Sequence, residues 1–209
     1  MSPFPITMIV LLLGSSRPKA NGLAFLPGWV AGIAVIVAAL TLLLDTVEAS
    51  GSGDPNALAG ILCLALGAGL LLLAGRKFAK RIKQSTAGSL PRWMASAETM
   101  APSRSLVTGL ALSAANPENP MITAAAGVTI GAASLSVSEE LWAMAAFLVV
   151  CSVTVAIPVA GYLVAPVNMA VPLASLMGWL RTNHSVMTGL LLLVFGFILI
   201  GNGIGSFQA

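Results

Sequence analysis

The chain has 209 residues, of which 57% are hydrophobic and 8% are charged, whereas roughly a quarter of the residues in a soluble domain are charged. Its formal net charge is only +3. This composition excludes an ordinary soluble domain, and so small a positive charge gives no reason to expect a nucleic-acid partner. We therefore predict an all-α membrane protein with several transmembrane segments.

Apolar stretches that could cross a bilayer recur along the chain. A helix needs about 20 apolar residues to span the hydrocarbon core. Four stretches approach or exceed this length without a charge: Leu23–Leu44, Ala57–Ala74, Leu141–Ala165 and Val186–Ile204. Leu106–Ala133 can span as two half-helices, whereas Pro5–Gly14 covers only about half of the membrane. The pattern predicts six transmembrane segments, of which the first is incomplete.

The fourth segment is interrupted by the motif Asn116-Pro117-Glu118-Asn119-Pro120. Proline removes a backbone donor and clashes with the preceding turn, so Pro117 and Pro120 should break the helix here. In lipid, a broken helix persists only where protein or a water-filled cavity satisfies the freed backbone groups. We predict a substrate or coupling-ion site at this break, with Asn116 and Asn119 as neutral hydrogen-bonding ligands and both prolines shaping the gap.

Glu118 is the charged residue of this motif. A charged side chain near the bilayer centre costs about 3 kcal/mol on insertion scales, and such residues commonly mark transport pathways. One hypothesis is that Glu118 takes up a proton or binds a cation during transport. The alternative is that it only caps the outer half-helix, whose N-terminal dipole favours an anion.

The two halves of the chain resemble each other. The first begins with Ser2-Pro3-Phe4-Pro5-Ile6 and the second contains the motif at 116–120, and each motif is followed by an apolar stretch and a long span. Three spans in each half imply that the halves are inverted, and inverted repeats with broken helices at corresponding places are typical of secondary transporters. We therefore assign Ser2, Pro3 and Pro5 to the same site, and we predict that a half-helix preceding them is missing from the chain.

This repeat defines three parts of the chain. We place the first three-helix repeat at residues 1–74 and the second at residues 105–209, each with a first helix broken by proline. A basic cytoplasmic linker at residues 75–104 joins them. Within the second repeat, the Pro-flanked amphipathic segment 166–183 is predicted to lie in the inner membrane interface before the last span.

The orientation follows from the cations, since cytoplasmic loops carry an excess of lysine and arginine. If the first loop is inside, the three inner loops hold all ten cations: Arg17 and Lys19; Arg76, Lys77, Lys80, Arg81, Lys83, Arg92 and Arg104; and Arg181. The outer loops hold acids and no cation: Asp45, Glu48, Asp54, Glu139 and Glu140. We predict a multi-pass membrane protein with basic loops in the cytoplasm and both termini outside.

Two pairs of glycines have the spacing that lets membrane helices approach closely. Gly28 with Gly32, and Gly127 with Gly131, are separated by three residues, and we interpret them as helix-packing positions. The chain contains neither a zinc-binding H-E-x-x-H motif nor a G-x-S-x-G nucleophile turn. We therefore predict no catalytic residue, no metal and no cofactor.

Further motifs occur in a fixed order along the chain: Ser2–Ile6, Ser16–Pro18, Asn21–Leu26, Gly28-Trp29, Pro91–Met94, Asn116–Asn119, Trp179–Asn183 and Val186-Met187. In this order and spacing they resemble the glycopeptidolipid-addressing (sulfolipid-addressing) protein family of the lysine-exporter superfamily, over nearly the whole chain. Glu118 and Pro120 depart from the family pattern, in which a lysine and an apolar residue are usual.

The resemblance implies a six-helix inner-membrane protein of actinobacterial type that helps move cell-envelope glycolipids outward, in a superfamily that exports amino acids and ions. We expect export of an amphipathic envelope lipid, coupled to a proton or cation. Two alternatives remain open: a small-solute exporter for amino acids or cations, and a non-transporting membrane scaffold for lipid-synthesis enzymes. The expected partners are membrane lipids, the substrate and the lipid-synthesis machinery, and a homodimer is also open.

Overall fold

The fold comes from a computed structural model, which describes residues 3–50, 54–83, 96–115, 118–133 and 135–207. Within these ranges the chain forms seven α-helices and one 3₁₀ helix: α1 (Pro3–Leu13), α2 (Pro18–Ser50), α3 (Pro55–Lys83), η1 (Ser96–Thr99), α5 (Pro102–Ala115), α6 (Glu118–Gly131), α7 (Val137–Val164) and α8 (Pro166–Gly205). Five of these α-helices begin at a proline, which fits the first helical position because its missing N–H has no partner there in any case.

Four helices are long and apolar enough to cross a membrane: Pro18–Ser50, Asn56–Ala79, Val137–Val164 and Thr188–Gly205. Each overlaps one of the uninterrupted spans predicted from the sequence. No more than 33% of the most apolar window of each helix is buried inside the protein, so most of its apolar surface faces outward. Helices that are apolar on all sides belong in lipid. The prediction of an all-α integral membrane protein is confirmed.

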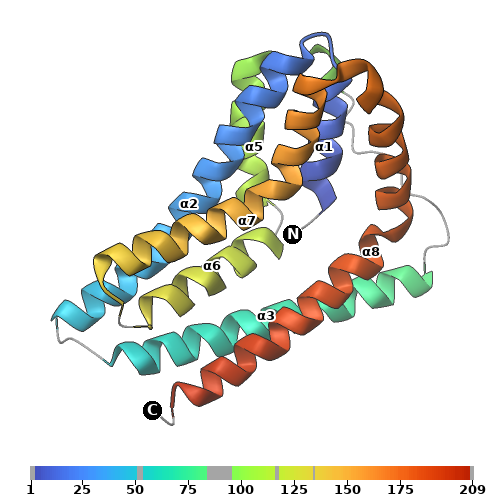
Figure 1. Cartoon of the computed structure of the whole chain (residues 1–209). Coiled ribbons are helices and arrows are strands. Elements are labelled where there is room, and N and C mark those ends of the chain that lie inside the picture. Colours follow the sequence, from blue (N-terminus) through green and yellow to red (C-terminus); the bar gives the residue numbers. More distant parts are fainter. Residues whose placement is uncertain (1–2, 51–53, 84–95, 116–117, 134, 208–209) are drawn as a thin grey trace.

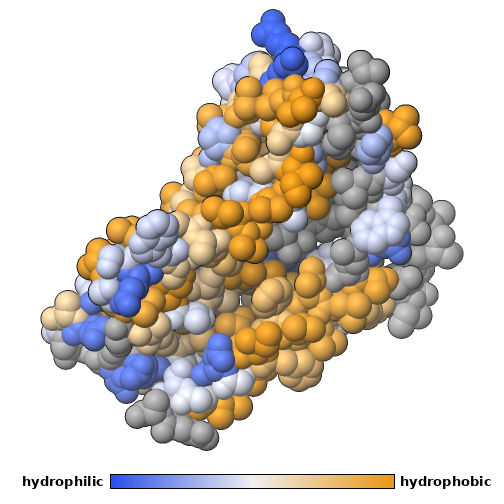
Figure 2. Space-filling view, viewed as in Figure 1, coloured by the Kyte–Doolittle hydropathy of each residue, from blue (hydrophilic) through white to orange (hydrophobic). Residues whose placement is uncertain are grey.

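The hydropathy of the surface agrees with this assignment. Hydrophobic residues cover most of the face in Figure 2, including α7 and the last part of α8, while hydrophilic residues gather at the top and at the lower left. In Figure 1 the connection between α1 and α2 lies at the top, and the end of α2, the end of α6 and the start of α7 lie together at the lower left. The apolar band therefore separates two polar ends.

The two remaining predicted segments are shorter helices. α1 contains 11 residues, which is about half of the length needed to span the hydrocarbon core. α5 ends at Ala115 and α6 begins at Glu118, so the fourth segment consists of two half-helices, and the break lies at the predicted motif.

Two hydrophobic cores hold the helices together. The first joins α1, α2, α5, η1 and α7, and its largest fully buried side chains are Trp29, Phe25 and Met8. The second joins the end of α2 to α3, α6 and α8, with Leu70, Val128 and Leu192 fully buried. Figure 1 shows the two groups, with α3 and the last part of α8 lying side by side and α6 between them and α2. The broken segment thus contributes one half-helix to each core.

α3 is longer than predicted. It continues to Lys83, so the basic run that begins at Arg76 is the end of a helix and not the start of a loop. Lysine and arginine are good helix formers, and their charge is favourable near a helix C-terminus. Residues 84–95 of the predicted linker lie outside the described part of the chain.

α8 combines two predicted elements. The segment predicted for the membrane interface and the last span form one helix from Pro166 to Gly205, with Pro172 inside it. The first part of α8 runs in a different direction from its last part (Figure 1). Proline in a helix removes one backbone hydrogen bond and commonly bends the helix without ending it. The interfacial position of residues 166–183 remains a prediction.

Candidate functional site

Because of the break between α5 and α6, this segment advances much less far along α2 than its number of residues would allow. Ser113 of α5 lies against Gly32, and Gly127 of α6 lies against Val37. Fourteen residues of the broken segment therefore pass only five residues of α2. A continuous helix rises about 1.5 Å per residue and would travel much further. The mismatch means that two helix ends, with their unpaired backbone groups, meet inside the bundle.

Asn119 ties α6 back to α5 across this break. Its side-chain amide nitrogen donates a hydrogen bond to the carbonyl oxygen of Leu112 at 3.3 Å, and its side chain is buried. Leu112 lies in the last turn of α5, where the carbonyls have no partner within the helix. Asn119 thus satisfies one of the backbone groups that the break exposes, as burial within a membrane requires.

Glu118, the first residue of α6, forms an ion pair with Lys77 of α3. The two residues lie on the facing apolar sides of their helices. Leu70 and Ala74 precede Lys77 at helical spacing, and Ile122 follows Glu118 by one turn; all three belong to the second core. The ion pair therefore lies at one end of the α3–α6 contact, where α6 begins. In Figure 1 the start of α6 is near the middle of the molecule.

The burial of the two partners is unequal. The side chain of Glu118 is 5% exposed and that of Lys77 is 23% exposed. Removing a carboxylate from water costs several kcal/mol unless a cation compensates for it. The dipole of α6 also favours a negative charge at its first residue. Lys77 and the start of α6 therefore both place positive charge beside the Glu118 side chain.

Thr123 adds a polar group to the same helix, one turn beyond Asn119. Its side chain is fully buried, and its hydroxyl has no hydrogen-bond partner among the described residues. Buried polar groups without a partner are uncommon and destabilising. Thr123 is therefore a further candidate for contact with a substrate or a water molecule at the break. The described residues contain no group of three His, Cys, Asp or Glu side chains that could hold a metal ion.

A sequence model of the sulfolipid-1-addressing protein family matches residues 1–205, which is nearly the whole chain. The chain belongs to this family. No curated protein and no solved structure matches it. The resemblance predicted from the sequence is thereby confirmed.

In this member of the sulfolipid-1-addressing family, the structure describes only part of the predicted site. Ser2, Asn116 and Pro117 lie outside the described residues. Pro3 begins α1, and Pro5 is buried in it. Pro120 is half-buried in the first turn of α6. The meeting of the two proline motifs remains a prediction.

The four predicted packing glycines all lie where helices approach closely. A Cβ atom at Gly28 would overlap the carbonyl oxygen of Leu106, and one at Gly32 would overlap the hydroxyl of Ser113. A Cβ at Gly127 would lie 2.7 Å from the carbonyl oxygen of Val37, and one at Gly131 would lie 3.0 Å from that of Thr41. Both half-helices therefore pack on α2 through glycine. The Thr41 hydroxyl also donates to the carbonyl oxygen of Gly127 at 3.2 Å.

Sequence reasoning missed Lys77 as a site residue. It assigned Lys77 to a cytoplasmic linker because six more cations follow or flank it in that loop. A signal was present, since Cys63, Leu70, Ala74 and Lys77 follow one another at intervals of seven, four and three residues, which is the spacing of one helix face. Extending that face by one turn would have placed a lysine at the inner end of a buried stripe.

Proposed function

We propose that this member of the sulfolipid-1-addressing family moves an amphipathic envelope lipid outward across the plasma membrane. Its membership in the family supports this proposal, because the family is described by the addressing of a lipid, sulfolipid-1. The outward-facing apolar surfaces of α2, α3, α7 and α8 support residence in the bilayer that contains such a lipid. The alternatives are a small-solute exporter and a scaffold for lipid-synthesis enzymes.

The observation that supports transport most strongly is the ion pair between the partly buried Lys77 and the buried Glu118. A scaffold has no need of a charged pair at a helix break inside the bundle. A transporter has such a need, because its helices must change partners, and an ion pair can be opened by a proton or by a competing charge. Buried ion pairs contribute little net stability compared with apolar packing, which makes a structural role alone a weak explanation.

The pair suggests how transport could be coupled. Protonation of Glu118 would remove the attraction that holds the start of α6 to α3. The anionic head of a lipid could then compete for Lys77, and α6 would be free to shift against α3. Loss of the proton would restore the pair. Asn119 keeps α6 attached to the end of α5 through Leu112 during this change.

Two further features support the proposed orientation and repeat. The loop between α1 and α2, which holds Arg17, and the start of α7, which holds Glu139, lie at opposite ends of the bundle (Figure 1), as expected if the basic end is cytoplasmic. α3 and α8 pack along each other, with a Cβ at Gly67 placed 2.9 Å from the carbonyl oxygen of Gly196. These glycines occupy the third span of each half, so their contact supports two inverted three-helix repeats.

The experiment is a transfer assay with the purified protein in proteoliposomes. A labelled anionic glycolipid is supplied in one leaflet, and its movement to the other is followed at several pH values. Wild-type protein is expected to accelerate the movement with a rate that depends on pH. Glu118→Gln, which resembles the protonated carboxyl, is expected to lose the pH dependence, whereas Arg76→Met, an exposed neighbour of Lys77 on α3, should retain it.

Other outcomes favour the alternatives. Transport of lysine or another amino acid without movement of the lipid would support a small-solute exporter. A folded protein that moves neither substrate at any pH would favour a scaffold. Equal pH profiles for wild type and Glu118→Gln would eliminate the coupling role of Glu118 while leaving lipid transport standing.

A further inference from the structure

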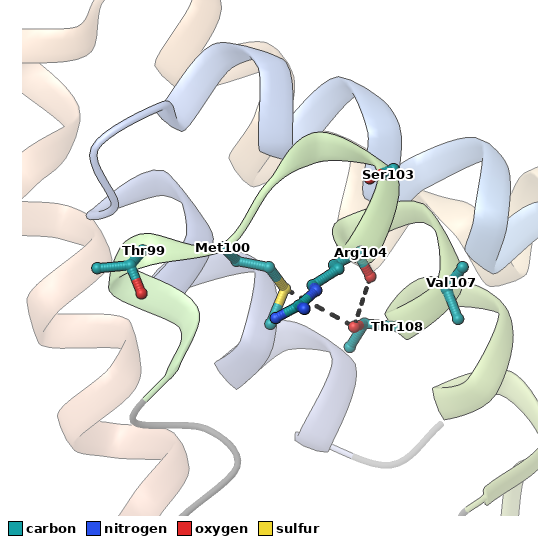
Figure 3. Close-up of a pocket in the computed structure, with 6 residues that line it drawn as sticks. All are labelled: Thr99, Met100, Ser103, Arg104, Val107 and Thr108. Carbon is teal, nitrogen blue, oxygen red and sulfur yellow. Dashed lines mark hydrogen bonds between the residues drawn. The ribbon is translucent and has the colours of Figure 1, made fainter.

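A pocket of about 370 Å³ opens to the outside where η1 leads into α5. Six residues line it, shown in Figure 3: Thr99, Met100, Ser103, Arg104, Val107 and Thr108. They include one guanidinium group and three hydroxyl groups and no carboxylate. Such a set of donors without a competing acid fits an anion, which arginine can bind with two parallel hydrogen bonds.

The wall of this pocket is fixed from the inside. The buried side chain of Asn21 donates hydrogen bonds to the Ser15 hydroxyl at 2.9 Å and to the Met100 carbonyl oxygen at 3.0 Å. Ala97 of η1 is fully buried in the first core. These contacts attach the η1–α5 junction to the loop between α1 and α2, so the pocket has a preformed backbone.

Its side chains are arranged around Arg104. The Thr108 hydroxyl donates to the Arg104 carbonyl oxygen at 2.7 Å and lies 3.7 Å from the Met100 sulfur. In Figure 3 the exposed Arg104 side chain extends toward Met100 and Thr108. The guanidinium is therefore presented at the pocket. Because the Thr108 hydroxyl already donates to the Arg104 carbonyl oxygen, the hydroxyl donors left for a ligand are those of Thr99 and Ser103.

The surface of α5 below the pocket is apolar. Val107 is 59% exposed and Leu110 is 43% exposed, and Ala111 and Ala114 are also exposed. They form a stripe along α5 from the pocket toward the break at residues 116–117. A cationic, hydroxyl-rich end followed by an apolar stripe matches a molecule with an anionic head and a hydrocarbon tail. A free anion would contact only the cationic, hydroxyl-rich end and not the apolar stripe.

We propose that this pocket binds the anionic headgroup, a sulfate or phosphate ester, of a lipid in the cytoplasmic leaflet, with an acyl chain lying along Val107 and Leu110. The inference rests on the proposed function, in which Arg104 lies on the cytoplasmic side, and it names the substrate class as an anionic amphiphile. The pocket is a first binding position, separate from the Lys77–Glu118 pair.

The test measures lipid binding to the purified full-length protein in nanodiscs of zwitterionic lipid. A fluorescent sulfated glycolipid is titrated into wild type, Arg104→Gln and Arg17→Gln. Arg17 is the matched control, because it is an exposed arginine at the same end of the bundle but does not line the pocket. Arg104→Gln is expected to weaken binding roughly tenfold through loss of a charge-assisted contact, and Arg17→Gln less than about twofold.

The other outcomes overturn the proposal. If the two substitutions weakened lipid binding equally, the effect would come from the general charge of that end of the bundle and not from the pocket. Inorganic sulfate that displaces the labelled lipid as well as unlabelled glycolipid does would make the pocket a free-anion site. Because binding is measured without transport, failure of this site is distinguishable from failure of the transfer assay. If the wild-type protein moves lipid and the Arg104→Gln variant binds lipid as tightly as wild type does, only this binding site is contradicted.

Discussion

Replacement of Lys77 by methionine is expected to lower the free energy of unfolding by about 3 kcal/mol, because it leaves Glu118 buried without its cation. Methionine retains the length and apolar character of the lysine stem, so the packing beside Ala74 is largely kept. Glu118→Gln should cost less, about 1 kcal/mol, since the Lys77 side chain is 23% exposed and can turn its ammonium group toward water. The measurement is denaturant unfolding in detergent micelles, followed by the helical circular dichroism signal.

The double variant and a neighbour separate the ion pair from other effects. Lys77→Met combined with Glu118→Gln should recover most of the loss seen with Lys77→Met alone, because no charge is then left uncompensated. Arg76→Met removes an adjacent but exposed cation and should change stability by less than about 0.5 kcal/mol. If Lys77→Met and Arg76→Met were equally mild, the pair would not be a buried interaction in the folded protein.

Gly28→Ala is expected to destabilise the protein by about 3 kcal/mol or to prevent its accumulation in a folded form. The added Cβ would overlap the carbonyl oxygen of Leu106, which is part of the α5 backbone and cannot move aside without separating α2 from α5. Overpacking of a close contact typically costs up to about 3 kcal/mol. Thermal unfolding of the detergent-solubilised protein measures the effect.

Gly75→Ala is the matched control for this substitution. Gly75 also lies within a long helix, but a Cβ there would meet no atom within 4 Å. Alanine is favoured over glycine in a helix interior by about 1 kcal/mol, so Gly75→Ala should be neutral or stabilising. Similar losses from Gly28→Ala and Gly75→Ala would show that glycine flexibility, and not the close approach of α2 and α5, is what the protein requires.

Much of the helical architecture could be predicted because it depends on local properties. Spans such as those in α2 and α7 follow from length and hydropathy alone, since a bilayer accepts only uncharged stretches of about 20 residues. The break between Ala115 and Glu118 follows from the prolines of the motif, whose effect on a helix is covalent and needs no knowledge of neighbours.

The partners of the site residues could not be predicted in the same way. Glu118 was predicted to be a site residue because of the cost of a charge in a membrane, but Lys77, with which it pairs, lies 41 positions earlier in the chain, within a basic run. Asn119 was predicted to bind a substrate, whereas in the structure its amide also holds the end of α5 through Leu112. Both contacts depend on how α3, α5 and α6 pack, which hydropathy does not specify.

The boundaries of α3 and α8 illustrate the same limit. A run of lysines and arginines is equally compatible with a loop and with a helix end. Residues 76–83 were predicted to form a loop, whereas they form the end of α3. The Pro166 to Asn183 segment was separated from the last span because of its prolines, but a proline near the start of a helix can be accommodated with a bend. The pocket at Arg104 was also missed, because its lining residues carry no motif.

Lipid analysis of the cell envelope after deletion of the gene tests the central claim most directly, with surface and intracellular lipids measured separately. We predict that one amphipathic lipid disappears from the surface and accumulates inside, that the wild-type gene restores it, and that Lys77→Met restores it less well than Arg76→Met. Unchanged surface lipids would contradict export of an envelope lipid. Loss of a lipid from both fractions would also contradict it, because a defect in synthesis is what a scaffold for lipid-synthesis enzymes would produce.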